Sequence, residues 1–446
     1  MSRLCLFIAA ALSAVSFASA EPPTASKQFE NLPNLPDRTN ELRKLISESQ
    51  GSFVPASGIY RITDTLEFSL NRKRSVVIRA SDGPVTIIMD GPGPAIRVIG
   101  SHEGSASPKS FEVATWNERM PLIDGIEIIG SHPEADGIEL IQCVQPTITR
   151  VAIRWCRHAI RLSQRNRNVA IASVHLYENS GIGLFLDDVN LHQINVSNSH
   201  ISYNRGGGIV VRDGNVRNLH ITGCDIEANM PADDTPTMTA NILLDVSNST
   251  EESRCSIAEV AITGCTIQHS SNYTKDDYDS IAPGGANIRI LGKESWPIDS
   301  VAITGNVISD TSVLIDISRA TDITLTGNTF FAPNPDFLHA KFSKRIIVNG
   351  NTFNPRQFNR PGRLLFDDCQ DCIISNCTFR RLEAEDGAIK IRNSTRFSLN
   401  SNNLSESTSG LRIENSEEIS VKNWLVSGLP QNTPFLSKDK SSSVLE

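Results

Sequence analysis

The stretches "VAITGCTI" (260–267) and "VAITGNVI" (301–308) are near-copies of each other, 41 residues apart. Related stretches lie on both sides of them: "LIDGIEI" (122–128), "TITRVAI" (147–153), "VAIASVHL" (169–176), "INVSNSHI" (194–201), "NLHITGCDI" (218–226), "ITLTGNTF" (323–330), "IIVNGNTF" (346–353), "CIISNCTF" (372–379) and "FSLNSNNL" (397–404). Aligned on the position of Asn306, the copies recur roughly every 22–26 residues, except for two steps of 41. Such a period is typical of proteins in which each repeat packs on its neighbours.

Two columns of this alignment contain only apolar residues. Three positions before the anchor stand Ile123, Ile148, Ile171, Val196, Ile221, Ile262, Ile303, Leu325, Val348, Ile374 and Leu399. Two positions after it stand Ile128, Ile153, Leu176, Ile201, Ile226, Ile267, Ile308, Phe330, Phe353, Phe379 and Leu404. The residues between them alternate in polarity, as in strands with one buried face. The sequence therefore predicts a solenoid of short strands around one continuous core.

A further strand recurs roughly ten residues later in each repeat. Its copies are "GIELI" (137–141), "AIRLS" (159–163), "GLFLD" (183–187), "GIVVR" (208–212), "NILLD" (241–245), "NIRIL" (287–291), "AIKIR" (388–392) and "GLRIE" (410–414). Each copy begins with Gly, Ala or Asn, which suit a turn. We therefore interpret "RGGG" (205–208) as a tight turn into a strand. A phosphate-binding loop would need a helix N-terminus after the glycines.

From residue 224 onward, the anchor position carries asparagine or cysteine. The asparagines are Asn306, Asn328, Asn351 and Asn402, and the cysteines are Cys224, Cys265 and Cys377. Asparagines at one turn position of successive coils can stack as an amide ladder. The anchor cysteines are accordingly expected to be small buried turn residues. For "CQDCIISNC" (369–377), a metal site and a local disulfide are the alternatives.

The two ends of the chain have the composition of non-repetitive segments. Arg3, the apolar run "LCLFIAAALSAVSF" (4–17) and "ASA" (18–20) predict a signal peptide over residues 1–20. We expect a linker over 21–36, the repeats with an N-terminal cap over 37–427, and a disordered tail over 428–446. The protein is then secreted or periplasmic, without a membrane span.

The overall charge argues against one class of partner. The formal net charge is −8, with 39% hydrophobic and 6% aromatic residues. Nucleic-acid binding depends on a cationic surface, so no nucleic-acid partner is expected. Small aliphatic residues with few rings favour stacked sheets. We expect a monomer.

On these repeats, the chain resembles the right-handed parallel β-helix proteins of the pectate-lyase-like superfamily. The stretch "DRTNELRKLISES" (37–49) is amphipathic, and "GSFVPASGIYRITDTLEF" (51–68) is similar to the segment that follows the capping helix there. The resemblance implies an all-β solenoid of about 11 or more coils with an N-terminal helix covering the first one. It says little about function, because this scaffold carries lyases, hydrolases, epimerases and non-enzymatic proteins.

The resemblance also implies where a site would lie. Substrate clefts in that superfamily run along the outer face of the first strand of each coil, which here is the strand beginning "G-I-x-L". The steps of 41 residues place insertions at 229–240 and 269–286, just before first strands of consecutive coils. We expect these insertions to form one wall of a cleft.

The outward positions beside that wall supply the catalytic candidates. Asp187, Arg212 and Asp245 should stack on neighbouring coils as an alternating charge triplet. An arginine there could neutralise a uronate carboxylate and ease proton loss from the adjacent carbon. Asp187, Asp213 and Asp245 could also hold Ca²⁺, which prefers several oxygen ligands; no cofactor is otherwise required. The alternative is a solvated salt-bridge ladder of little energetic weight.

The remaining candidates surround this triplet. The residues expected to bind substrate are Arg161, Phe185, Arg205 and Arg289, together with Tyr273, Lys275 and Tyr278 of the second insertion. His200 and Tyr203, at the third strand, are candidates for acid–base catalysis. Their face lies away from the first-strand cleft except at its loop end, so stacked surface histidines are the alternative interpretation.

The favoured hypothesis is an exported carbohydrate-active protein with lyase- or epimerase-like action on an acidic polysaccharide. The rival is a non-catalytic β-helix that binds glycans or has a structural role at a surface. A polygalacturonase is disfavoured, because "FDDCQDC" (366–372) and "AIKIR" lack the intervening Gly-His-Gly. A nucleotide-binding enzyme is disfavoured, because no helical period follows any glycine cluster.

Overall fold

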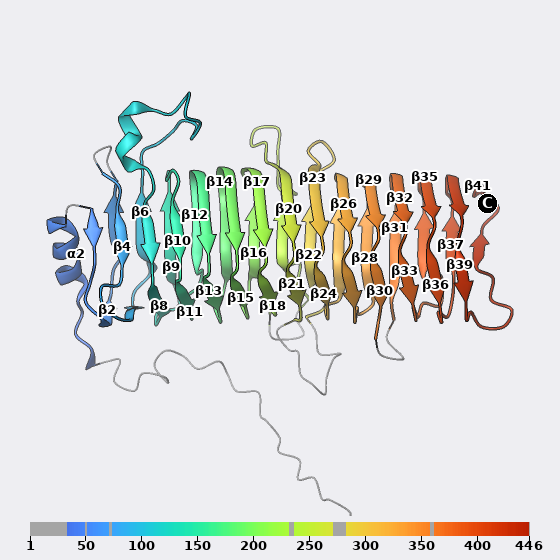
Figure 1. The fold of residues 1–446 in the computed structure, drawn as a ribbon, viewed down its shortest axis with the longest axis horizontal. Helices are drawn as coiled ribbons and strands as arrows, with labels where there is room; N and C mark the ends of the chain where they lie inside the picture. The colour runs from blue at the N-terminus through green and yellow to red at the C-terminus, as the bar shows by residue number, and fades with distance from the viewer. Residues whose placement is uncertain are drawn as a thin grey trace, which may run out of the picture.

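The chain winds into a parallel β-helix in which each turn stacks on the one before it (Figure 1). The computed structural model describes residues 34–49, 51–70, 74–231, 236–270, 282–356 and 361–445. The expected signal peptide over 1–20 lies outside the described residues, as do residues 21–33 of the expected linker. Within the described part, no helix is long and apolar enough to cross a membrane.

Three parallel strands per turn build the solenoid. The first strands are β3 (Leu66–Ser69), β6 (Gly93–Ile99), β9 (Ala135–Ile141), β12 (Ile160–Ala172), β14 (Ile182–Ser197), β16 (Gly207–Arg212), β19 (Ala240–Asp245), β22 (Ala286–Leu291), β25 (Val313–Ser318), β28 (Asp336–Lys341), β31 (Arg363–Asp367), β34 (Ile389–Arg392), β37 (Leu411–Glu414) and β40 (Leu436–Lys438). The long strands β12 and β14 bend through the first corner and continue as second strands.

The other second strands are β1 (Ser52–Phe53), β4 (Val77–Arg79), β7 (Leu122–Asp124), β10 (Thr147–Thr149), β17 (Asn215–Thr222), β20 (Ser256–Thr263), β23 (Ile298–Thr304), β26 (Ala320–Thr326), β29 (Lys344–Asn349), β32 (Gln370–Ser375), β35 (Thr395–Asn400), β38 (Glu417–Lys422) and β41 (Val444–Leu445). First and second strands together form one 27-stranded sheet.

The third strands form a separate 14-stranded sheet. They are β2 (Gly58–Ile62), β5 (Val85–Met89), β8 (Ile126–Gly130), β11 (Ala152–Arg154), β13 (His175–Tyr177), β15 (His200–Ser202), β18 (Asp225–Glu227), β21 (Thr266–Gln268), β24 (Val307–Ser309), β27 (Thr329–Phe331), β30 (Thr352–Asn354), β33 (Thr378–Arg380), β36 (Asn403–Ser405) and β39 (Leu425–Ser427). The prediction of about 11 or more coils is confirmed.

The core follows the two apolar columns of the repeat. Every residue of both columns is buried. Their register is regular, since Ile262 pairs with Ile303 and Ile303 with Leu325. A slip of one residue would turn each strand's apolar side chains to solvent, so the alternation fixes the register. The predicted arrangement of the core is confirmed.

Two asparagine ladders line the turns. At the anchor, Asn306 Nδ2 donates to Asn328 Oδ1 at 3.0 Å, and Asn328 Nδ2 to Asn351 Oδ1 at 3.0 Å. Another ladder follows the third strands, where Asn204 Nδ2 donates to Asn229 Oδ1 at 2.7 Å. Each amide also satisfies backbone groups of the adjacent coil, as buried polar groups must.

The cysteines are buried turn and core residues. All eight cysteines from Cys143 onward are buried and free of disulfides. At the anchor, the Cys265 backbone N–H donates to Asn306 Oδ1 at 2.9 Å, so cysteine continues the ladder without an amide of its own. The alternative of a local disulfide within 369–377 is therefore wrong. No group of three metal-ligating side chains occurs among the described residues.

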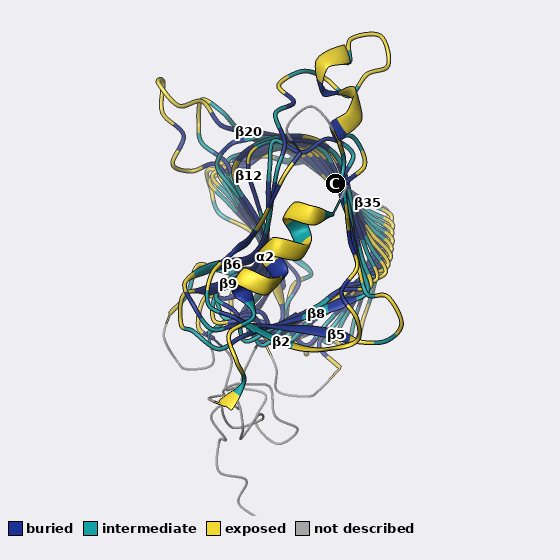
Figure 2. Ribbon diagram, turned by 90° about the vertical axis from the view of Figure 1, so that its left-hand side faces the viewer, coloured by how far each residue is buried: buried dark blue, intermediate teal, exposed yellow. Residues whose placement is uncertain are grey.

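Both ends of the core are covered. Helix α2 (Thr39–Glu48) lies across the first coil (Figure 2) and buries Leu42 in the core, which agrees with the expected cap. The expectation of a disordered tail is wrong for β40 and β41, which pair with β37 and β38. Leu436 and Val444 pack against the last coil, whose apolar end would otherwise face water.

Candidate functional site

The outward face of the first strands has the register that the sequence predicts. Asp187 pairs with Arg212 across β14 and β16, and Arg212 pairs with Asp245 across β16 and β19. Two residues earlier along the strands, on the same outward face, Arg161 pairs with Phe185. The candidate residues of these strands therefore lie side by side on one face.

The expected charge triplet is in register but its members do not pair with one another. Asp187 accepts instead from Arg161, with Nε–Oδ2 at 2.9 Å and Nη2–Oδ2 at 2.5 Å. Asp245 Oδ1 accepts from the backbone N–H and the hydroxyl of Ser247, at 2.9 and 2.6 Å. Arg212 lies over the ring of Phe185, 5.6 Å from its centroid. Among the described residues, Arg212 has no carboxylate partner.

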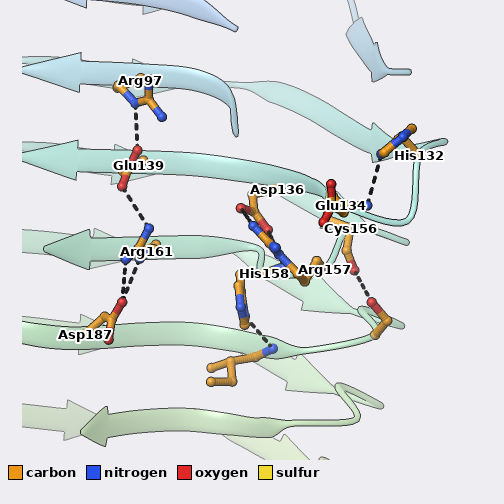
Figure 3. A network of polar contacts seen from close by, with 12 residues as sticks. Arg97, His132, Glu134, Asp136, Glu139, Cys156, Arg157, His158, Arg161 and Asp187 are labelled. Carbon is orange, nitrogen blue, oxygen red and sulfur yellow. Dashed lines mark hydrogen bonds and ion pairs between the residues drawn. The ribbon is translucent and has the colours of Figure 1, made fainter. Parts of the chain in front are cut away.

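A chain of ion pairs runs across the neighbouring coils (Figure 3). Arg97 Nε lies 2.7 Å from Glu139 Oε2, and Arg161 Nη1 lies 3.2 Å from Glu139 Oε1. Glu139 is 6% exposed, so its charge depends on both arginines. This series of ion pairs continues from Arg161 to Asp187, and it does not include Arg212. The repeat pattern gives no indication of Arg97 or of the bridging role of Glu139.

His158 is a polar side chain of this face that the sequence analysis missed. Its Nδ1 accepts from the Ile182 backbone N–H at 3.1 Å, which leaves the proton on Nε2. Its ring lies 5.3 Å from that of Phe185. Burial lowers the pKa of His158, although Asp136 acts in the opposite direction. His158 is thus a neutral imidazole that can donate a hydrogen bond from Nε2.

Asp136 fixes the backbone at His158. Arg157 binds it through Nε–Oδ1 at 3.0 Å and Nη2–Oδ2 at 2.6 Å. Oδ1 of Asp136 also accepts from the His158 backbone N–H at 3.0 Å. The same Figure 3 shows this pair beside the ion-pair chain. His158 immediately precedes the first-strand copy "AIRLS" (159–163), and this position could have indicated it. The alternation pattern covers only positions within the strands.

Asp213 follows Arg212 at the corner of the coil. Burial raises the pKa of Asp213 and the charges of Asp245 and Asp188 act in the same direction, while a hydrogen bond from Asn248 and the charge of Arg212 act against it. Its Oδ1 is buried without a hydrogen-bond partner in the described part of the chain. A carboxyl group of raised pKa next to an available guanidinium is suited to proton transfer.

The expected calcium ligands do not come together. Asp187 is engaged by Arg161 and Asp245 by Ser247. In the described ranges, no set of three acidic, histidine or cysteine side chains is arranged to hold a metal ion. The residues present therefore do not fit a calcium site built from Asp187, Asp213 and Asp245.

The two insertions were expected to form one side of an open cleft. Their described parts instead lie over the outer face of the first strands and bury residues there. The Thr237 backbone N–H donates to Pro283 O at 2.9 Å, so the two insertions meet. The outward residues Val210 and Leu243 are 0% and 3% exposed. Tyr273, Lys275 and Tyr278 lie outside the described residues.

Two residues expected to bind substrate are buried instead. Arg289 is 2% exposed, and its guanidinium is used within the protein by Asp316 (2.7 Å), Thr239 O (3.3 Å) and Gly284 O (2.6 Å). Phe185 is 7% exposed because His158 and Arg212 pack on it. Arg289 anchors the insertions, and Phe185 positions its two neighbours.

The third-strand candidates form a separate cluster. His200 belongs to the 14-stranded sheet, where its ring stacks on His175 at 5.0 Å and its Nδ1 lies 3.6 Å from Asp225. Tyr203 follows the same strand and is 44% exposed. Arg205 lies in the turn toward β16, with its backbone N–H bonded to Asn179 O at 2.9 Å. The structure does not bring His200 and Tyr203 together with Arg212, which lies in the other sheet.

Comparison with known proteins agrees with this architecture. A family model for the right handed beta helix region matches residues 95–250 and 240–426. The tailspike protein gp49 from Pseudomonas phage LKA1 superposes with a TM-score of 0.53 at 12% identity, covering 94% of this chain and 80% of that one. No curated protein matches the sequence.

Two further solved structures are similar at a lower level. The Dettilon tailspike protein (gp208) has a TM-score of 0.48 at 12% identity, over 93% of this chain and 72% of that chain. The A-module of mannuronan C-5 epimerase AlgE4 from Azotobacter vinelandii has a TM-score of 0.40 at 14% identity, over 92% and 96%. At these identities the likeness is one of fold. The family match spans most of the coils, and the chain therefore belongs to the right-handed β-helix family.

Proposed function

We propose that the protein acts on an acidic polysaccharide, by lyase- or epimerase-like chemistry, at the first-strand face around Arg212. The observation that carries the proposal is the guanidinium of Arg212, which has no carboxylate partner among the described residues although Arg97 and Arg161, on earlier coils of the same face, are both paired. Export through residues 1–20 is part of the same proposal.

Arg212 would bind the carboxylate of a uronate residue. A guanidinium matches a carboxylate with two parallel hydrogen bonds, and it keeps its charge at any physiological pH. Phe185 beneath it excludes water from one side and strengthens the interaction. Once the carboxylate is neutralised, the carbon next to it can lose its proton more easily.

Asp213 is the group best placed to take that proton. Its raised pKa makes the carboxylate a stronger base than an exposed aspartate. The C5 proton passes to Asp213 and its electron pair remains at C5, next to the neutralised carboxylate. In a lyase this pair forms the C4=C5 double bond as the C4–O bond breaks, and the leaving oxygen takes up a proton from water. In an epimerase a proton from water returns to C5 from the opposite face.

His158 would orient the sugar rather than accept its proton. The Nδ1 lone pair is already used by the Ile182 N–H. The Nε2 N–H is the donor that remains, and a neutral donor suits a sugar hydroxyl. This role follows from the hydrogen-bond geometry and the lowered pKa together.

A non-catalytic glycan-binding protein is the second candidate, favoured by one observation. Glu139 and Asp187 are both held in ion pairs, which leaves few free carboxylates on this face. A protein of this kind would bind polyuronates without converting any of them to product.

The test is turnover on a panel of polyuronates, with and without a chelator. Unsaturated product is measured by its ultraviolet absorbance, and epimerised residues by proton NMR. Arg212→Ala should lower kcat/KM about 100-fold, as for the loss of one charge-stabilising donor. Asp213→Asn should abolish proton transfer. Arg380→Ala, on the third strand β33, is the matched control and should leave the rate unchanged.

Two results would reject the proposal. Wild-type protein that binds polyuronate but forms neither product would support the non-catalytic rival. Turnover that persists at the wild-type rate in Arg212→Ala would move the chemistry away from this face.

A further inference from the structure

A cleft opens where first strands β25, β28 and β31 turn into second strands. Its volume is about 600 Å³. The side chains that matter for its chemistry are Lys293, Arg319, Phe342 and Lys344, with Glu294 and Asp368 also lining it. None of the sequence motifs pointed to this corner.

The corner residues project outward because their backbone is left-handed. Arg319 has φ 52° and Phe342 has φ 51°. Their backbone N–H groups continue the hydrogen bonding between neighbouring coils. Arg319 N donates to Lys341 O at 3.2 Å, and Phe342 N donates to Asp367 O at 3.0 Å. Arg319 and Phe342 consequently stack on consecutive coils, with the guanidinium 4.7 Å from the ring centroid.

The cleft combines an aromatic surface with positive charge. Phe342 is 47% exposed, which is high for a phenylalanine. Among the described residues, Lys293, Arg319 and Lys344 have no carboxylate partner. Lys293 Nζ donates to Ser249 O, and Arg319 Nη1 to Ser318 Oγ at 3.4 Å. Arg345 is satisfied by Asp322, so the surplus charge rests on the other three cations.

Two loops separate this cleft from Arg212. Residues 246–255 and 292–297 contact each other through Lys293 and Ser249, and through Arg254 over the ring of Trp296 at 5.8 Å. Figure 1 shows both loops projecting above β20 and β23. The register places Arg319 three coils beyond Arg212, or about 14 Å along the axis at the spacing of neighbouring strands.

The geometry points to a second binding site in this cleft, for an anionic sugar residue. The exposed ring of Phe342 offers a flat apolar surface for the C–H face of a pyranose. Lys344 and Arg319 lie at its edge and supply donors for a carboxylate. The inference rests on the proposed function for the class of ligand, but it uses none of the residues of the Arg212 site.

The test is calorimetric titration in an Arg212→Ala background, which leaves this cleft intact and suppresses turnover. The probes are trigalacturonate and the neutral trisaccharide maltotriose. Adding Arg319→Gln and Lys344→Glu should weaken trigalacturonate binding at least about tenfold for the loss of two charge-assisted contacts. Glutamine suits the backbone at this corner, since Gln142 and Gln164 adopt φ 52° and 57° there.

The control variant is Lys422→Glu, which repeats the charge change of Lys344→Glu on an exposed lysine of β38. It should bind trigalacturonate as the Arg212→Ala parent does, and thermal melting should show all variants folded. Maltotriose should not bind. The inference is overturned if the parent fails to bind trigalacturonate, or if the Arg319/Lys344 variant binds as tightly as the parent. Neither result depends on whether the wild-type protein turns over a polymer, so failure here and failure of the proposed function are distinguishable.

Discussion

Arg289 gives the sharpest test of how the insertions are held on the solenoid. We expect Arg289→Met to destabilise the protein strongly, because it leaves the carboxylate of Asp316 buried without its partner. Arg289 is 2% exposed and Asp316 is 6% exposed. Removing one member of a buried ion pair costs about 3–5 kcal/mol. Asp316 Oδ1 already lacks a hydrogen bond among the described residues, and the neighbouring His339, whose pKa is lowered by burial, is a poor replacement for the guanidinium.

The same substitution should loosen both insertions. Arg289 Nη1 and Nη2 bind the carbonyls of Thr239 and Gly284, one from each insertion. Hydrogen–deuterium exchange should therefore accelerate in β19 and β22 and remain at the wild-type rate in β35 and β38, because a solenoid opens locally. Urea unfolding followed by circular dichroism measures the loss of stability.

The double variant Arg289→Leu/Asp316→Leu is the matched control. The neighbouring outward residues Val210 and Leu243 are apolar and buried, so two leucines extend an existing apolar row. More than half of the lost stability should return, since a buried ion pair can be replaced by packed apolar side chains. Arg289→Met with wild-type stability, or a double variant less stable than the single one, would refute the reasoning.

Three further expectations follow from the fold and the site. Asn204→Ala should cost about 3 kcal/mol in urea unfolding, because it removes the bonds to Asn229 Oδ1 and Leu176 O and leaves Asn179 Nδ2 with only its long contact to Ile153 O; a cost far below 1 kcal/mol would show that the ladder adds no stability. The pKa of His158 is lowered in the folded protein, so below about pH 6.5 the unfolded chain binds a proton at this residue more readily than the folded chain does. The free energy of unfolding should therefore fall as the pH drops below this value. His158→Gln should flatten this fall, and an unchanged pH profile of the melting temperature would count against it. Burial raises the pKa of Cys143 to about 12, and the other described cysteines are also buried, so an aromatic disulfide reagent should leave all of them unmodified until the protein is unfolded.

The sequence was sufficient to predict the register of the first strands. Alternation places Asp187, Arg212 and Asp245 on one outward face, since a shift of one residue would bury them. It could not predict the pairing of their side chains. Asp187 has an arginine on either side, and the rotamer of Arg161 decides the choice. Periodicity contains no information about that rotamer.

Which outward side chains are buried was harder to predict from the sequence than the register of the strands. Arg289 stands in an outward column, and only the path of the two insertions places it under cover. A non-repetitive loop has no period from which its path can be inferred. Arg319 and Phe342 were missed for a related reason, because left-handed corner residues fall outside the strand pattern on which the alignment depends.

The most direct measurement of the central claim is a cycle between Arg212 and the substrate carboxylate. Initial rates are measured for wild-type protein and Arg212→Ala, each on a polyuronate and on its methyl ester. If the guanidinium neutralises the carboxylate, wild-type protein should prefer the acid by about tenfold or more, the worth of one charge-assisted hydrogen bond. Arg212→Ala should show no such preference. An equal preference in both proteins, or no turnover of any polyuronate, would contradict the account.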